Sequence, residues 1–121
     1  MSNQADCIFC KIVERKLPAN IVYETDTVLA FHDIQPVAPV HILIIPKKHI
    51  ATMNDVTEAE LTLIADIHRA AQEIAKQFGI AESGYRLVNN CNSDGGQVVY
   101  HIHYHLLGGE AIGGLRAGHS H

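Results

Sequence analysis

The chain has 121 residues, of which 47% are hydrophobic, and a formal net charge of −4, so it is long and apolar enough for one domain with a buried core. No basic run exceeds Lys47-Lys48, which argues against general binding to DNA or RNA but is compatible with a mononucleotide. No apolar run reaches the roughly 18 residues of a membrane span. Residues 1–6 are too polar for a signal peptide, so we expect a cytoplasmic protein without membrane contact.

The first half of the chain predicts a short helix and three strands. Pro18 ends the helix, the polar pair Thr25-Asp26 makes a turn between two strands, and Pro46 closes a strand that is apolar on both faces. The helix is expected over residues 7–16, and the strands over 21–23, 28–31 and 41–45.

The second half predicts one long helix and two strands. Thr57 and Glu60 form a capping-box pattern that starts the helix, and Gly79 ends it. The helix is expected over residues 57–78, the strands over 85–90 and 98–107, a tight polar loop over 92–97 and a Gly-rich tail over 110–121. Together these elements indicate an α+β fold with a five-stranded, mostly antiparallel sheet, one long helix and a short N-terminal helix.

The apolar residues of the long helix fall in two stripes. A helix that packs on one sheet needs a single apolar stripe, so the second stripe either widens the first or packs against another subunit in a dimer. The first stripe comprises Leu61, Ile64, Ala65, His68, Ala71, Ala75 and Phe78, and the second comprises Leu63, Ile67, Ala70 and Ile74.

Three histidines, His101, His103 and His105, alternate with apolar residues in the last expected strand. Alternate side chains of a strand share a face, and three imidazoles are costly to bury together without partners. They either ligate a metal, as in a zinc-dependent hydrolase, or supply a neutral imidazole as nucleophile or base. The preceding turn, Gly-Gly-Gln at 95–97, offers backbone amides that can cradle an anion, which favours a phosphate site beside a nucleophile.

The segment 95–109 (GGQVVYHIHYHLLGG) resembles the histidine-triad signature His-φ-His-φ-His-φ-φ, in which φ is apolar. Within the histidine triad (HIT) superfamily the chain is most similar to the Hint branch, the purine nucleoside phosphoramidases. The resemblance implies a single HIT domain over 1–121 and a homodimer whose two sheets join into one of ten strands, with the long helices at the interface. It covers roughly residues 7–109 and includes the segments 31–34, 38–41 and 44–50.

The resemblance also implies roles for four histidines. His103 attacks the α-phosphorus of a purine nucleoside 5′-phosphoramidate (an AMP or GMP derivative) or a related aminoacyl adenylate, and water then releases the monophosphate from a covalent nucleotidyl-histidine. The backbone carbonyl of His101 orients His103, while His105 attends the leaving group and His41 contacts the phosphate. No metal is required for this chemistry. The alternative outside catalysis is a nucleotide-binding regulatory partner.

Nucleotide contacts follow from the same resemblance. Asp33 accepts from the ribose hydroxyls, and Asn90 donates near the phosphate. Gln97 and the amides of Val98 and Val99 hold the phosphate. Val98 stands where animal relatives often have serine, so a hydroxyl that could assist the leaving group is absent. An apolar slot, which could equally be ordinary core, holds the base; it comprises Ile8, Phe9, Ile12, Phe31, Ile34 and Leu43.

Two of the three cysteines lie in the spacing Cys7-x-x-Cys10. An odd count with this spacing is a poor disulfide framework and indicates a metal pair, a redox pair or ordinary thiols. Some histidine-triad proteins hold a zinc with two cysteines and two histidines, and the resemblance places these ligands at Cys7, Cys10, His49 and His101. A closed site with four protein ligands is typical of structural zinc.

Overall fold

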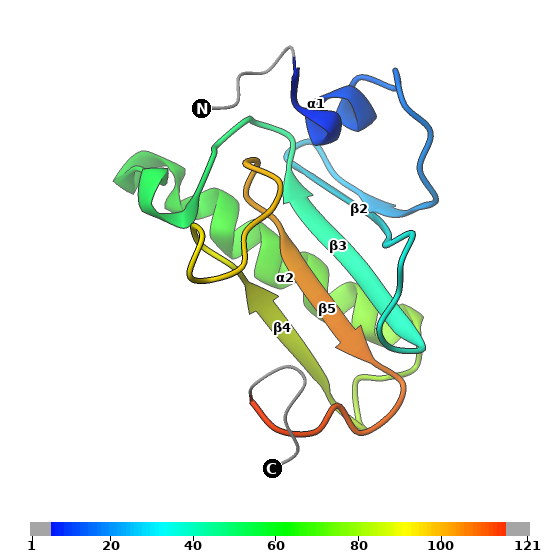
Figure 1. Cartoon of the computed structure of the whole chain (residues 1–121). Coiled ribbons are helices and arrows are strands. Elements are labelled where there is room, and N and C mark those ends of the chain that lie inside the picture. Colours follow the sequence, from blue (N-terminus) through cyan, green and yellow to red (C-terminus); the bar gives the residue numbers. More distant parts are fainter. Residues whose placement is uncertain (1–5, 116–121) are drawn as a thin grey trace.

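Five antiparallel strands form one sheet in the order β1-β2-β3-β5-β4, with α2 crossing behind it (Figure 1). The computed structural model describes residues 6–115. Within that range, no helix combines the length and the hydropathy needed to cross a bilayer. The elements are α1 (Ile8–Val13), β1 (Ile21–Glu24), β2 (Val28–His32), β3 (Val40–Pro46), α2 (Leu61–Gln77), β4 (Tyr85–Asn89) and β5 (Tyr104–Gly108). The predicted α+β class and the antiparallel sheet are confirmed.

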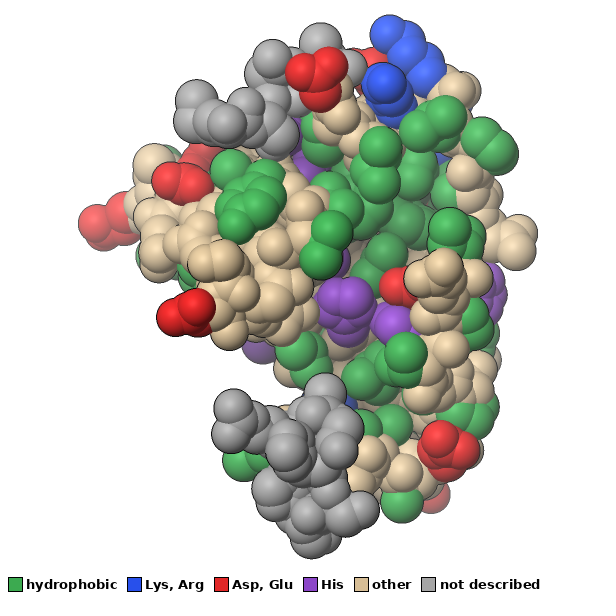
Figure 2. Space-filling model, viewed as in Figure 1, with side chains coloured by type: hydrophobic (Ala, Val, Ile, Leu, Met, Phe, Trp, Pro, Cys, Tyr) green, Lys and Arg blue, Asp and Glu red, His purple; other side chains and the backbone are tan. Residues whose placement is uncertain are grey.

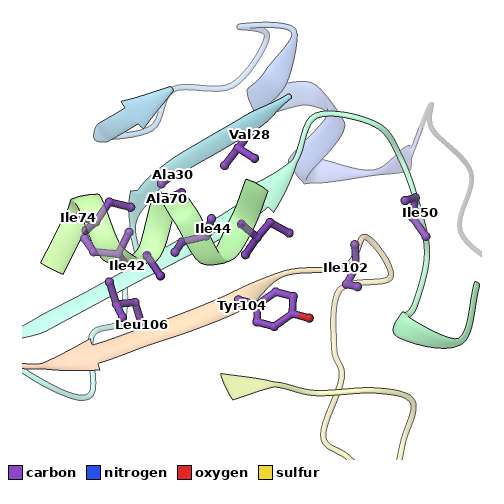
Figure 3. Close-up of a cluster of buried hydrophobic side chains, with 12 residues drawn as sticks. Val28, Ala30, Ile42, Ile44, Ile50, Ala70, Ile74, Ile102, Tyr104 and Leu106 are labelled. Atoms are coloured by element: carbon purple, nitrogen blue, oxygen red, sulfur yellow. The ribbon is translucent and has the colours of Figure 1, made fainter. Parts of the chain in front are cut away.

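The central strands are buried on both faces because nearly all of their alternating residues are apolar. On one face, Ile44 and Leu106 pack against Ile74 of α2 (Figure 3). On the other face, Phe31 and Leu43 belong to a second cluster that includes α1. The sheet therefore separates two layers, and the layer on the α1 side contains Cys7 and Cys10.

Both ends of α2 form as the sequence predicts. The amide of Thr57 donates to Oε1 of Glu60 at 3.0 Å, which completes one half of the capping box. Residues 58–60 form a 3-10 turn, so the α-helix proper begins at Leu61 rather than at Thr57. Gly79 has a φ of +71°, and the amide of Ile80 donates back to the carbonyl of Ala75 at 2.9 Å, as expected for a glycine-terminated helix.

The two apolar stripes of α2 meet in one broad buried face. Ile67, Ala70, Ala71, Ile74 and Ala75 are all buried. The outer edge of the first stripe remains exposed, and it consists of Leu61, Ala65 and His68. A single wide stripe thus accounts for most of the pattern, and the exposed edge is the part of this stripe that α2 leaves for a second subunit.

The last strand is shorter than predicted. The expected strand covers residues 98–107, whereas β5 begins only at Tyr104. Upstream of Tyr104 the ladder would continue toward Pro46 of β3, which has no amide to donate and whose carbonyl is taken by Nε2 of His101 at 2.8 Å. The amide of Ile102 bonds instead to the carbonyl of Ile50 at 2.7 Å. His101 and His103 therefore lie before β5, and the alternation of side chains along a strand does not determine which way they point.

The short N-terminal helix is also shorter than expected. The predicted helix covers residues 7–16, whereas α1 ends at Val13. Arg15 adopts a φ of +63°, a left-handed conformation that stops an α-helix. The predicted C-terminal tail, 110–121, is described only as far as Leu115.

Candidate active site

A cavity of about 560 Å³ opens on the α1 side of the sheet. Figure 2 shows histidine side chains in a hollow of this face, bordered by hydrophobic side chains. The six residues predicted for the base slot all line the cavity, so the structure brings them together from α1, β2, β3 and the loop after β2. The cavity is also lined by Asp33, Asn90, Val98, Val99, His103 and His105.

His103 lies in the wall of this cavity with its ring held in one orientation. Its Nδ1 lies 2.8 Å from the carbonyl oxygen of His101. A carbonyl only accepts, so Nδ1 carries the proton and Nε2 keeps a lone pair. The ring is buried to 7% exposure and meets the edge of Phe9 at a centroid distance of 5.1 Å. Burial lowers the pKa of His103, which keeps the imidazole neutral.

His105 and His41 form a second hydrogen-bonded unit beside His103. Nδ1 of His41 accepts from the amide of Val37 at 3.1 Å, so in the neutral ring the proton lies on Nε2. That Nε2 lies 2.9 Å from Nδ1 of His105. His105 therefore accepts at Nδ1 and presents its own Nε2–H as a donor. His41 itself is buried and does not line the cavity. The phosphate contact of His41 therefore stays a prediction, and in this structure the contact of His41 on the cavity side is with His105.

Asp33 anchors the loop that leads into β3. One carboxylate oxygen accepts from the amide of Gln35 at 2.7 Å, and the other lies 3.4 Å from Nε2 of His41. Asp33 also lines the cavity, so its predicted contact with a ribose stays a prediction that the position allows.

The groups of Asp33, His41 and His105 lie within 4.8 Å of one another and are of types that bind metals. The amide of Val37 argues against that use, because it occupies Nδ1 of His41. A metal on Nε2 would leave both ring nitrogens without a proton, which a neutral imidazole does not allow. Within residues 6–115, no group of potential ligand atoms brings His101, His103 and His105 together, so the geometry does not support a zinc-dependent hydrolase built on the three triad histidines.

The cysteine pair meets two histidines in a separate buried cluster. Sγ of Cys7 lies 3.3 Å from Nδ1 of His101, and Sγ of Cys10 lies 3.2 Å from Nδ1 of His49. All four ligand atoms lie within 4.8 Å of one another. Ligand atoms on a tetrahedral zinc are about 3.5 Å apart, so these residues fit the metal. Nε2 of His101 donates to the carbonyl of Pro46, which turns Nδ1 toward the sulfurs.

Burial raises the pKa of the Cys10 thiol to about 12, with further contributions from Cys7 and Glu14. The bare cluster therefore holds a protonated thiol at Cys10, and a bound cation would have to supply the charge that a thiolate needs.

The loop before the triad differs from its expected role. The amides of Gly95, Gly96 and Gln97 all donate inside the loop, to the carbonyls of Asn92 and Ser93, so they do not form an anion cradle. A Cβ on Gly95 would lie 2.5 Å from the carbonyl oxygen of Cys91, which explains why this tight turn requires glycine.

The polar groups in and beside this loop differ in whether they bond within the protein or are accessible from the cavity. The side-chain amide of Gln97 donates to the carbonyls of Ala51 and Val99, and it does not line the cavity. Asn90 lines the cavity while it donates to the carbonyl of Gly95. Within residues 6–115 the amides of Val98 and Val99 donate to no protein group. These two amides are therefore available to donate to a ligand in the cavity.

Three groups of the site have no signal in the sequence. Asn89 donates to the carbonyl of His103 at 3.0 Å, the amide of Val37 holds His41, and the carbonyl of Pro46 holds His101. Two of the three are backbone atoms, which every residue carries, so only the folded chain reveals them.

The sequence matches the HIT domain family over residues 14–112, a range that begins after Cys7 and Cys10. It is 52% identical over 112 residues to the purine nucleoside phosphoramidase of Escherichia coli (strain K12). This alignment covers 93% of this chain and 94% of that protein. A HIT family hydrolase from Legionella pneumophila superposes with a TM-score of 0.87 at 55% identity, covering 88% and 96% of the two chains. A histidine triad protein from Clostridium difficile superposes with a TM-score of 0.90 at 46% identity, covering 96% and 100%.

The half-buried position of His105 predicts a dependence of stability on pH. Burial, with smaller contributions from the neighbouring His103 and His41, lowers the pKa of His105 to about 4. Below the ordinary value of 6.5 the unfolded chain therefore gains a proton that the folded chain does not, so the free energy of unfolding falls as the pH drops from 6.5 toward about 4. Urea unfolding at several pH values, with a chelator present throughout, measures this slope. His105→Asn should make the slope shallower without removing it, because burial also lowers the pKa of His41, His101 and His103. The exposed His68→Asn should leave the slope unchanged, and equal slopes in wild type and His105→Asn would contradict the assignment.

Proposed function

The chain belongs to the HIT domain family of hydrolases, and on that premise we propose that it cleaves the P–N bond of purine nucleoside 5′-phosphoramidates. One observation carries the proposal: Nδ1–H of His103 is held by the carbonyl of His101, so Nε2 is the unprotonated nitrogen in the wall of an apolar cavity. The relative at 52% identity is named a purine nucleoside phosphoramidase.

In the proposed reaction, Nε2 of His103 attacks the α-phosphorus and forms a covalent nucleotidyl-histidine. When the substrate nitrogen is protonated, the amine leaves as a neutral molecule with the P–N electron pair. His105 then needs only to donate a hydrogen bond from Nε2, to the leaving nitrogen or to a phosphoryl oxygen. Water next attacks the phosphorus, Nε2 of His103 departs with its electron pair, and the proton lost by water passes to the solvent.

The rest of the cavity supports a nucleotide as the ligand. The amides of Val98 and Val99 are the proposed phosphate donors, and Asp33 is the proposed acceptor for the ribose hydroxyls. The base slot is apolar, so it would hold a purine by contact area rather than by hydrogen bonds. It is formed by Ile8, Phe9, Ile12, Phe31, Ile34 and Leu43.

Replacement of the nucleophile tests the mechanism. His103→Asn should lower kcat for an adenosine or guanosine 5′-phosphoramidate by at least about a thousandfold, because no covalent intermediate can form. The matched control is His68→Asn, an exposed histidine on α2, which should keep wild-type kcat. Mass spectrometry of wild-type protein quenched with a slow substrate should show a nucleotidyl adduct on His103. Turnover that persists in His103→Asn would refute the mechanism, and nucleotide binding without any turnover in wild type would favour a regulatory role.

We also propose that Cys7, Cys10, His49 and His101 hold a structural zinc. The support is the closeness of their ligand atoms, which all lie within 4.8 Å of one another, and the burial of the cluster between α1 and the segment after β3. The metal would tie these two segments together, and it would stabilise the position of His101 beside the nucleophile.

Metal analysis tests the zinc site. Wild-type protein should bind about one zinc per chain, and Cys10→Ser should lose it, because three remaining ligands leave an open position. Chelation should lower the Tm of wild type toward that of Cys10→Ser. Cys91→Ser serves as the control, since Cys91 lies outside the cluster. Equal zinc content in Cys10→Ser and wild type would exclude these ligands.

A reducing compartment, the cytoplasm, is the proposed location. Cys7, Cys10 and Cys91 are all free thiols. Oxidation of the Cys7–Cys10 pair would remove half of the proposed ligand set, so the site needs conditions in which thiols persist.

The proposed quaternary structure is a homodimer in which the two sheets join. Two features support it: β4 is an edge strand, and Leu61 at the start of α2 is 53% exposed. Sedimentation equilibrium should give about twice the chain mass of 13.3 kDa, and Leu61→Lys should weaken association, because it places a charge in an apolar contact. A mass equal to one chain at micromolar concentration would contradict the dimer.

A further inference from the structure

The loop between β2 and β3 closes on His41 at three points. The amide of Asp33 donates to the backbone carbonyl of His41 at 3.0 Å. The amide of Val37 donates to Nδ1 of the His41 ring at 3.1 Å, and a carboxylate oxygen of Asp33 lies 3.4 Å from Nε2 on the other side of the ring. The His41 side chain is therefore in contact with this loop through both of its nitrogens.

These contacts determine where the ring proton lies. An amide can only donate, so Nδ1 of His41 has no proton while the Val37 contact persists, and a carboxylate favours N–H on the opposite nitrogen. The proton on Nε2 is then directed at Nδ1 of His105, 2.9 Å away. Nδ1 of His105 must accept, which leaves the proton of His105 on Nε2.

We propose that the backbone amide of Val37 is a remote positioning group that keeps the proton on Nε2 of His41 and thereby keeps His105 a hydrogen-bond donor toward the cavity. This inference deepens the proposed function, on which its catalytic consequence rests. If the chain of hydrogen bonds ran the other way, His105 would present a lone pair to the phosphate oxygens and would repel them.

The amide, not the side chain, is what the site uses at this position. The Val37 side chain is 72% exposed, so its shape contributes little to the fold. Pro36 and Pro39 restrict the backbone on either side of it, and the turn at Asp33 and Gln35 closes the start of the loop. The loop thus presents one N–H group at a defined place without burying a side chain.

The proton positions can be read directly in wild-type protein. NMR of ¹⁵N-labelled protein should show a coupling across the hydrogen bond from the Val37 amide to Nδ1 of His41. A second coupling should join Nε2 of His41 to Nδ1 of His105, with the proton bonded to His41. The ¹⁵N shifts of His105 should report an unprotonated Nδ1. A proton on Nδ1 of either ring would overturn the inference, whatever reaction the protein catalyses.

Three variants separate the amide from the loop. Val37→Pro removes the N–H, Val37→Ala keeps it, and Ala38→Pro places a proline one residue later, where the amide donates to no group within residues 6–115. Val37→Pro should shift the tautomer ratio of His41 toward Nδ1–H by about fivefold and lower kcat by a similar factor with KM nearly unchanged, as expected for the loss of one neutral hydrogen bond. Val37→Ala and Ala38→Pro should stay within about twofold of wild type.

The outcomes are distinguishable. If Val37→Pro and Ala38→Pro give the same tautomer ratio and the same kcat, the amide has no special role and the inference fails. If Val37→Pro does not fold, the wild-type spectrum alone decides the proton positions. If the wild-type tautomers are as stated but no phosphoramidate is hydrolysed, the proposed function fails and the tautomer assignment stands.

Discussion

The hydrogen bond from Nδ1–H of His103 to the carbonyl of His101 connects the two functional regions of this protein. The backbone carbonyl of His101 orients His103, the proposed nucleophile. The side chain of His101 faces Cys7 and Cys10 with Nδ1 and donates from Nε2 to the carbonyl of Pro46. A displacement of His101 would therefore disturb both the cysteine cluster and the position of His103. The segment before β5 leaves the sheet because the carbonyl of Pro46 accepts from the His101 imidazole and is not available to a neighbouring strand.

A common rule governs the buried histidines of the site. Each ring has at least one partner that can only donate or only accept, such as the amide of Val37 for His41 or the carbonyl of His101 for His103. Such partners determine the tautomer without any charge. Among the described residues, no buried side-chain nitrogen or oxygen lacks a hydrogen-bond partner. Because an unpaired polar group is costly in a buried site, this network holds each imidazole in one protonation state and one orientation.

Most of the fold could be predicted from local pattern. The capping box at Thr57, the stop at Gly79 and the apolar run of β3 are short-range signals, and the structure has each of them. The errors concern residues whose conformation depends on distant partners. Alternation predicts a strand through His101 and His103, but the available partner there is Pro46, which cannot continue a ladder. The glycine turn at 95–96 likewise predicts a site for an anion, whereas its amides donate to carbonyls within the loop.

The amino-acid sequence by itself determined the residue types of the site, the apolar lining of the slot and the elements that carry them, because these follow from composition and periodicity. The tertiary structure decided which nitrogen of each histidine is a donor, that His41 lies against His105, and that backbone groups of Val37 and Pro46 bond to the histidine rings. The physical reason is that a tautomer is set by whichever partner the fold places against the ring. That partner lies four residues away for His41 and fifty-five residues away for His101, and it is in both cases a backbone atom that no sequence pattern distinguishes.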